Sequence, residues 1–485
     1  MEVLPGDGRN GTKNEILTEG LFVERFIMAQ VKNPHVLETE SIGKLLLQYS
    51  IPAIIGMTVT SLYNIIDSIF IGHGVGPLAI SGLALTFPLM NLVIAFCTLI
   101  GVGGAAVSSI YLGQKDDHKA TEVLHNVLLL CLIAGVCFGG LTSFFLDPIL
   151  LFFGASEHTL PYARDFMHVL LMANPVSFVF IGLNNVMRAT GYPKKAMLSS
   201  LLTVGVNVIL APIFIFGLDW GIKGAAIATV IAQCCGVVWV LNHFYNKSSY
   251  VHFQKGYYRL NWHVVRAIFS IGMAPFLLNV CASAVVIILN HSFKKYGGDL
   301  AIGAYGIVNR ILILFAMVVV GLTQGMQPIV GYNFGAARYD RVRQALKKAL
   351  IAGVSIMTVG WLVNELFPQH IVAMFSDDAE LNDLAQFGIR ISCLMFPLVG
   401  AQIIITNFFQ SIGKAQISIF LSLARQLLFL IPLLFILPRY FGITGVWSSM
   451  PVADFIAFVA AALTLRWYVK KMKRNDSTVL VNKNL

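Results

Sequence analysis

Long runs of apolar residues, separated by short polar segments, recur from Leu45 almost to Lys470. Each run is long enough to cross a bilayer, because about 20 helical residues span its hydrocarbon core. The runs are continuous and do not alternate apolar with polar positions, which excludes a barrel of spanning strands. The pattern therefore predicts an all-α polytopic membrane protein with twelve transmembrane helices, at about 45–72, 78–110, 123–146, 161–188, 195–217, 221–245, 265–293, 300–330, 347–367, 384–410, 416–437 and 443–468.

The two halves of the chain repeat one another. A constant offset of 222 residues places Gly103 over Gly325 and Pro175 over Pro397. Six helices per repeat is an even number, so both copies enter the membrane in the same direction. We therefore expect two parallel six-helix lobes with pseudo-two-fold symmetry about the membrane normal. This architecture favours alternating access over a simple pore or a single-site enzyme.

The charges of the loops predict the orientation and the domain limits. Lys and Arg collect in the loops on one side and in the C-terminal tail, so both termini are expected to face the cytoplasm from a plasma (inner) membrane. Met28 is a second plausible start, so residues 1–27 are either a disordered tail or an error of start assignment. The expected domains are a polar cytoplasmic tail (1–43), an N-lobe (44–245), a cytoplasmic inter-lobe loop (246–262), a C-lobe (263–470) and a cytoplasmic tail (471–485).

Composition agrees with a membrane protein and excludes several functions. Charged residues make up only 12% of the chain and mean hydropathy is +0.75, which does not fit a soluble protein of 485 residues. The net charge of +10 is carried by loops and the C-terminus and does not indicate nucleic-acid binding. The seven cysteines fall in apolar runs, without a disulfide framework or metal-ligand spacing. No nucleotide-binding loop or hydrolase motif is present, so we expect neither an enzyme nor a primary ATP-driven pump.

Two carboxylates stand inside the predicted spans and away from the helix ends. Asp67 lies among Ile65, Ile66 and Ile69 in the first run. An ionised side chain at the bilayer centre costs about 3 kcal/mol or more, so such a residue is kept where a partner, an ion or a proton offsets the cost. Asp67 is therefore the main candidate for a cation or proton site; a neutral, hydrogen-bonded acid is the alternative. Asp454 is either a coupling group or a helix-start carboxylate stabilised by the helix dipole.

Other residues in the spans are weaker candidates for a functional role. Arg310 and Arg425 are expected to snorkel or to form an ion pair between helices. Pro52 lies about four turns before Asp67 and removes a backbone hydrogen bond, so it is a candidate hinge or a static kink. Three intramembrane amides are candidate coupling or gating groups, although most such amides only bond helix to helix: Asn64, Asn185 and Asn407.

Several segments in this order resemble the MATE (multidrug and toxic compound extrusion) transporters, and are most similar to the bacterial MepA-like branch. The resemblance covers about residues 44–470. It rests on NIIDSIFIG at 64–72, GQK at 113–115, MRATG at 187–191, NVILAPIF at 207–214, GIKGAAIAT at 221–229 and WSSMPVAD at 447–454.

The resemblance implies an antiporter that exports cationic amphipathic compounds in exchange for H⁺ or Na⁺. It also implies a cation- or proton-binding site of Asp67, Asn207 and Thr229. A fourth position falls on Ala211, where relatives commonly carry Asp or Asn. Hard cations such as Na⁺ take several oxygen ligands, so this departure slightly favours H⁺. A C-lobe cation site is doubtful because the glutamate that some branches place on helix seven is absent.

The expected partners are small cationic drugs and membrane lipids, with a monomer as the functional unit. No cofactor besides the coupling ion is expected. A flippase for lipid-linked saccharides, from the related superfamily, is the alternative transporter. It would favour a strongly basic intramembrane cavity to hold a pyrophosphate. An enzyme embedded in the membrane would need clustered acid, base or metal-binding residues near one membrane face.

Overall fold

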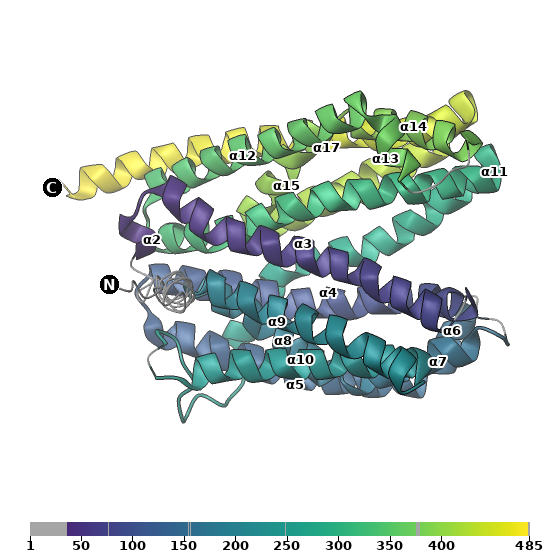
Figure 1. Cartoon of the computed structure of the whole chain (residues 1–485). Coiled ribbons are helices and arrows are strands. Elements are labelled where there is room, and N and C mark those ends of the chain that lie inside the picture. The colour runs from purple at the N-terminus through teal and green to yellow at the C-terminus, as the bar shows by residue number, and fades with distance from the viewer. Residues whose placement is uncertain are drawn as a thin grey trace, which may run out of the picture.

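A computed structural model describes residues 36–75, 77–153, 155, 157–247, 249–374 and 379–483 (Figure 1). Residues 1–27, whose origin the sequence leaves open, and the side chain of Asn64 lie outside this description. Within the described ranges the chain is helical and has no strands, as the apolar runs predict.

In the first half of the chain, the described residues form ten helical segments. These are α2 Val36–Thr39, α3 Ile42–Val75, α4 Pro77–Gly113, α5 Asp117–Phe144, α6 Leu146–Phe152, α7 Leu160–Met172, α8 Asn174–Ala189, α9 Pro193–Pro212, the π-helix η1 Ile213–Gly217 and α10 Gly221–Tyr245. The second half comprises α11 Trp262–Gly335, α12 Tyr339–Leu366, α13 Pro368–Ala373, α14 Ala379–Cys393, α15 Phe396–Ser411, α16 Ala415–Leu423, the π-helix η2 Ala424–Leu430 and α17 Ile431–Lys483.

These helices provide the twelve predicted spans. Nine stretches of the described chain are long and apolar enough to cross a membrane, or eleven when two bent helix pairs each count as one span. One of the nine, Ala415–Lys470, has 56 residues, which is about 84 Å of helix and far longer than a bilayer core. Gly442 interrupts it with φ 55° and ψ −133°, so it is two spans and the total is twelve.

Two of the predicted spans are bent. The run at 161–188 divides into α7 and α8 at an angle of 58°, and the run at 384–410 divides into α14 and α15 at 52°. Pro175 and Pro397 stand in the first turns of α8 and α15. Proline lacks a backbone N–H and clashes with the preceding turn, so each helix restarts there.

The repeat extends to details of the backbone. Lys115 and Ala337, 222 residues apart, both have positive φ (60° and 55°). Gly191 and Gly413, with the same separation, have φ of 106° and 73°. Figure 1 shows helices α4, α5 and α8 to α10 grouped on one side and α12 to α17 on the other, with α3 between the groups. These are the two expected lobes.

The end of the predicted polar tail (1–43) is ordered where the structure describes it. The α2 helix begins at Val36, and the side chain of Leu37 is completely buried. The Leu37 carbonyl accepts hydrogen bonds from Asn333 Nδ2 and Arg341 Nη2, both at 3.0 Å. Leu37 thus docks α2 on the end of α11, although its neighbours are polar enough to suggest a free tail. The start of α2 and the end of α17 lie at the same end of the bundle (Figure 1).

The loop between α10 and α11 is held against α5. The Tyr250 hydroxyl donates a hydrogen bond to Asp117 Oδ2 at 2.9 Å, and Asn261 Nδ2 donates to Glu122 Oε1 at 2.8 Å. Burial, together with the bond to Asp117, raises the pKa of Tyr250 to about 12, so its hydroxyl remains a donor at neutral pH. The loop therefore contacts the first half of the chain through defined bonds.

Candidate functional site

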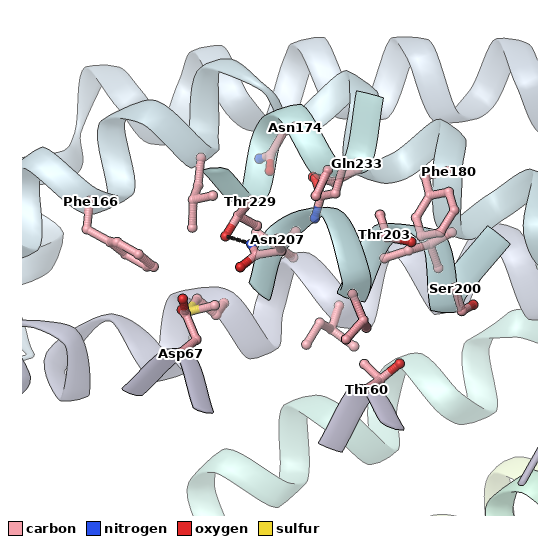
Figure 2. A pocket seen from close by; sticks show the side chains of 18 of the residues that line it. Thr60, Asp67, Phe166, Asn174, Phe180, Ser200, Thr203, Asn207, Thr229 and Gln233 are labelled. Atoms are coloured by element: carbon pink, nitrogen blue, oxygen red, sulfur yellow. Dashed lines mark hydrogen bonds between the residues drawn. The ribbon is translucent and has the colours of Figure 1, made fainter. Parts of the chain in front are cut away.

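A cavity of about 300 Å³ lies inside the first lobe, between α3, α4 and α7 to α10 (Figure 2). Much of its wall is apolar, including Met90, Phe166 and Phe180. Its polar lining residues come from α3, α8, α9 and α10: Thr60, Asp67, Asn174, Ser177, Ser200, Thr203, Asn207, Thr229 and Gln233. An apolar cavity with a few convergent polar groups is typical of a small-molecule site.

Asp67 supplies the only carboxylate among the described lining residues, and none of them is a lysine or arginine. The carboxyl oxygen Oδ1 is buried and has no hydrogen-bond partner among the described residues. A buried acid without a counter-ion binds a proton or attracts a cation, because an uncompensated buried charge is costly. Among the described lining residues, Asp67 of α3 is thus the one charged group that faces the cavity.

Asn207 and Thr229 lie together on the wall opposite Asp67 (Figure 2). Asn207 Nδ2 donates to Thr229 Oγ1 at 2.9 Å, and that hydroxyl donates to the Ala225 carbonyl at 3.1 Å. This chain fixes the amide so that its carbonyl oxygen lies on the side of Asp67 (Figure 2). The structure therefore brings the three residues of the predicted site to one cavity. Ala211, one turn along α9, is buried and adds no side-chain ligand.

Sequence reasoning missed a second polar group in the same cavity. Asn174 and Gln233 lie beside the Asn207–Thr229 pair (Figure 2). Gln233 Oε1 accepts a hydrogen bond from Ser177 at 2.5 Å, whereas Asn174 Nδ2 is buried without a partner among the described residues. The available signal was the proline next to Asn174, because a helix break inside a span often exposes polar groups to a cavity.

Asp454, the other acidic candidate, is neutralised within the second lobe. Its Oδ1 lies 2.5 Å from Arg425 Nε, and the residue is 5% exposed. The repeat places Arg425 over Thr203 at the 222-residue offset, and Asp454 over Gln233 with a slip of one residue. The ion pair thus stands at positions whose first-lobe counterparts line the cavity.

The other predicted candidates lie away from the lining. Asn185 Nδ2 donates to the Ile181 carbonyl at 2.8 Å, and Asn407 Nδ2 donates to the Ile403 carbonyl at 2.9 Å. Each amide thus bonds to its own helix. Pro52 lies inside α3, which continues through it. The exposed Arg310 has no ion pair with another described residue.

Comparison with known proteins accounts for the internal repeat. The model of the MatE family matches residues 52–213 and again 273–436, so two copies begin 221 residues apart. The two matches cover most of the chain. The chain belongs to the MATE family. The predicted membership and the helical fold are confirmed.

Relatives of this MATE protein match over most of their length. It is 30% identical over 424 residues to the multidrug export protein MepA of Staphylococcus haemolyticus (strain JCSC1435), covering 87% of this chain and 93% of the relative. The MepA of Staphylococcus aureus (strain MSSA476) is 28% identical over 426 residues, covering 88% and 94%.

Solved structures have the same fold. The MATE multidrug transporter DinF-BH in complex with R6G aligns with a TM-score of 0.82 and 35% identity, covering 88% of this chain and 96% of DinF-BH. A multidrug resistance MATE transporter in an outward-facing conformation aligns with a TM-score of 0.86 and 24% identity, covering 90% and 98%. The latter likeness is one of fold.

Proposed function

We propose that this MATE protein is a secondary active multidrug exporter, which exchanges cationic amphipathic compounds for H⁺ or Na⁺ by alternating access. The observation that carries the proposal is the single acid, Asp67, in a cavity whose described lining has no basic residue. The relatives named as multidrug export proteins support the substrate class.

The cavity suits flat cations. Aromatic and methionine side chains such as Phe166, Phe180 and Met90 adapt to apolar rings and attract positive charge. Asp67 neutralises one positive charge at a time, so a bound drug and a bound coupling ion compete for it. This competition is reciprocal: an ion that weakens drug binding is itself weakened by the drug to the same extent. Antiport follows when each occupant favours a different arrangement of the lobes.

The donors around Asp67 favour the proton. Asn207 and Thr229 are the other two side chains of the proposed site, and their mutual bond uses one of the two lone pairs of the threonine oxygen. Ala211 offers no oxygen where a further ligand would stand. Because Na⁺ takes several oxygen ligands and a proton needs only the carboxylate, we propose H⁺ as the coupling ion. Na⁺, with backbone or water oxygens as additional ligands, is the second candidate.

The proposal includes a topology. The N-lobe comprises residues 44–245 and the C-lobe residues 263–470, with the loop 246–262 and both termini in the cytoplasm and a monomer as the functional unit in the plasma membrane. The basic loops at the end of the bundle that carries α2 support this orientation. A saccharide flippase is not favoured, because the described lining of the cavity contains no Lys or Arg to hold a pyrophosphate.

The test is ethidium efflux from everted vesicles under an imposed ΔpH or ΔpNa, comparing Asp67→Asn with the native protein. Asp147→Asn is the matched control, because Asp147 is exposed and pairs with Arg164 at a helix end. We expect Asp67→Asn to abolish ion-driven efflux at normal expression and the control to leave it intact. Undiminished coupled efflux by Asp67→Asn would refute the proposal, and the gradient that drives the native protein identifies the ion.

A further inference from the structure

The two lobes touch backbone to backbone at one end of the bundle, through glycines that the repeat relates. A Cβ atom on Gly113, at the end of α4, would lie 1.9 Å from the carbonyl oxygen of Tyr332. A Cβ atom on Gly335, at the end of α11, would lie 2.1 Å from the carbonyl oxygen of Ile110. Both pairs are the same contact, because residues 110 and 113 become 332 and 335 at the 222-residue offset. Only glycine allows this approach.

The close contact continues along α4 and the first part of α11. A Cβ atom on Gly103 would lie 2.2 Å from the Ile268 carbonyl oxygen, and one on Gly272 would lie 1.8 Å from that of Leu99. From residue 99 to residue 113, α4 rises about 21 Å, so the contact spans more than half of a bilayer core.

Further from this end, side chains take over the contacts between α4 and α11. The rings of Phe96 and Phe276 have centroids 5.0 Å apart, and Asn91 Nδ2 reaches Ser283 Oγ at 3.5 Å. The helices therefore separate progressively toward the end of the bundle opposite to α2.

A half-buried arginine, Arg188, bridges the two lobes near these glycine contacts. Arg188, at the end of α8, donates from Nη1 to Gln324 Oε1 on α11 and from Nη2 to Asn184 Oδ1 at 3.3 Å. Gln324 stands between Gly321 and Gly325, whose added Cβ atoms would lie 2.6 Å from Ile54 Cα and 2.5 Å from Ser50 Cα of α3. Breaking the Arg188–Gln324 bond is therefore part of separating α11 from the first lobe.

The partners of Arg188 are uncharged. Asn184 is held by its own bonds, with Nδ2 donating to the Ala196 carbonyl at 3.0 Å, so its oxygen stays directed at Arg188. A buried guanidinium bonded to a carboxylate is hard to release, because either charge left alone is strongly unfavourable. A guanidinium bonded to an amide loses less free energy when the amide moves away. Arg188 keeps its bond to Asn184, and water that enters can take the place of the Gln324 oxygen. This chemistry suits a bond that is broken and remade.

We propose that Arg188, Gln324 and the glycine contacts at residues 103, 113, 272, 321, 325 and 335 form a gate that holds the two lobes together at the α2 end. Each transport cycle breaks the Arg188–Gln324 bond and separates these backbones. Gln324 is then the residue that sets how long the gate stays closed. The inference rests on the proposed alternating access, and it names the contacts that break and re-form during the cycle.

The experiment measures how fast a reporter cysteine, Ser109→Cys, reacts with a maleimide in the full-length protein, with the native cysteines replaced. Ser109 is buried and faces Gly331 of α11 across the gate. Arg188→Gln should speed labelling at least tenfold by breaking the cross-lobe bond without adding bulk. Gln324→Glu should slow labelling and reduce efflux at least tenfold, because a carboxylate of the same shape locks the arginine in place.

Glycine variants and their controls complete the test. Gly113→Ala and Gly335→Ala should speed labelling, whereas Gly205→Ala and Gly140→Ala, whose added Cβ atoms meet nothing within 4 Å, should not. Labelling of Arg188→Gln at the native rate, or native efflux by Gln324→Glu, overturns the gate. Opposite effects of the Arg188 and Gln324 variants cannot arise from misfolding. The two proposals are tested by different readouts. Asp67→Asn should lose ion-coupled efflux without a change in the labelling rate, so a failure of the antiport proposal appears in efflux and a failure of the gate appears in labelling.

Discussion

The Arg425–Asp454 pair allows a quantitative test of the division of roles between the lobes. The pair joins η2 to α17 with an N–O distance of 2.5 Å, and the side chains are 33% and 6% exposed. Removing one partner of a buried pair costs about 3–5 kcal/mol, because the other charge is left uncompensated. Since the Arg425 side chain is a third exposed and the pair is not fully buried, we expect the lower end, about 3 kcal/mol, for Asp454→Asn or Arg425→Gln.

Replacing both partners should recover most of this loss. The variant Arg425→Thr with Asp454→Gln installs the residues that the repeat places at 203 and 233 in the first lobe. With no charge left buried, we expect it to fall within about 1 kcal/mol of the native protein. Its ion-coupled efflux should remain, because the pair neutralises itself and stays outside the described cavity lining.

The assay is equilibrium unfolding in mixed micelles, together with efflux in vesicles. Asp147→Asn, which breaks the exposed pair with Arg164, is the control and should cost no more than about 1 kcal/mol. A double variant no more stable than either single variant would refute the reasoning about uncompensated charge. A stable double variant without ion-coupled efflux would instead show that Asp454 takes part in ion coupling.

Three further outcomes are expected. Ala211→Asp should increase efflux driven by ΔpNa relative to ΔpH in vesicles, because it adds a carboxylate one turn from Asn207. Thr229→Val keeps the shape but removes the partner of Asn207 Nδ2, and should lower ion-coupled efflux about tenfold, as expected for one lost hydrogen bond of about 1.4 kcal/mol. Asp116→Ala removes the N-cap of α5, which accepts from Lys119 N at 3.0 Å, and should cost about 1 kcal/mol in unfolding assays. The side-chain bond from Lys119 holds the pKa of Asp116 below its usual range, so this contribution is present at neutral pH and is lost as the pH falls through that lowered value.

The fold and the acidic centre of the site could be read from sequence because they depend on local patterns. Apolar runs of spanning length and the 222-residue repeat are visible without knowledge of contacts, and so is one acid inside a run. The bends at Pro175 and Pro397 were less visible, because the apolar pattern continues across them.

Contacts between distant helices could not be predicted. Arg425 and Asp454 were each candidates, but whether they meet depends on the rotation of η2 and α17. Asn174 and Gln233 resemble the many amides that only bond helix to helix. Pro175 is a signal for Asn174, but nothing in the sequence marks Gln233 as facing a cavity. Arg188 lies in a recognisable segment, yet its partner Gln324 is 136 residues away.

The most direct test of the central claim is the proton balance of drug binding. Ethidium is added to the purified protein in weakly buffered detergent, at a pH low enough for Asp67 to be protonated beforehand. If drug and proton compete for this one carboxylate, the native protein releases about one proton for each drug bound, by linkage, and Asp67→Asn releases none. Drug binding without proton release by the native protein, in the absence of sodium as well as in its presence, would contradict the account.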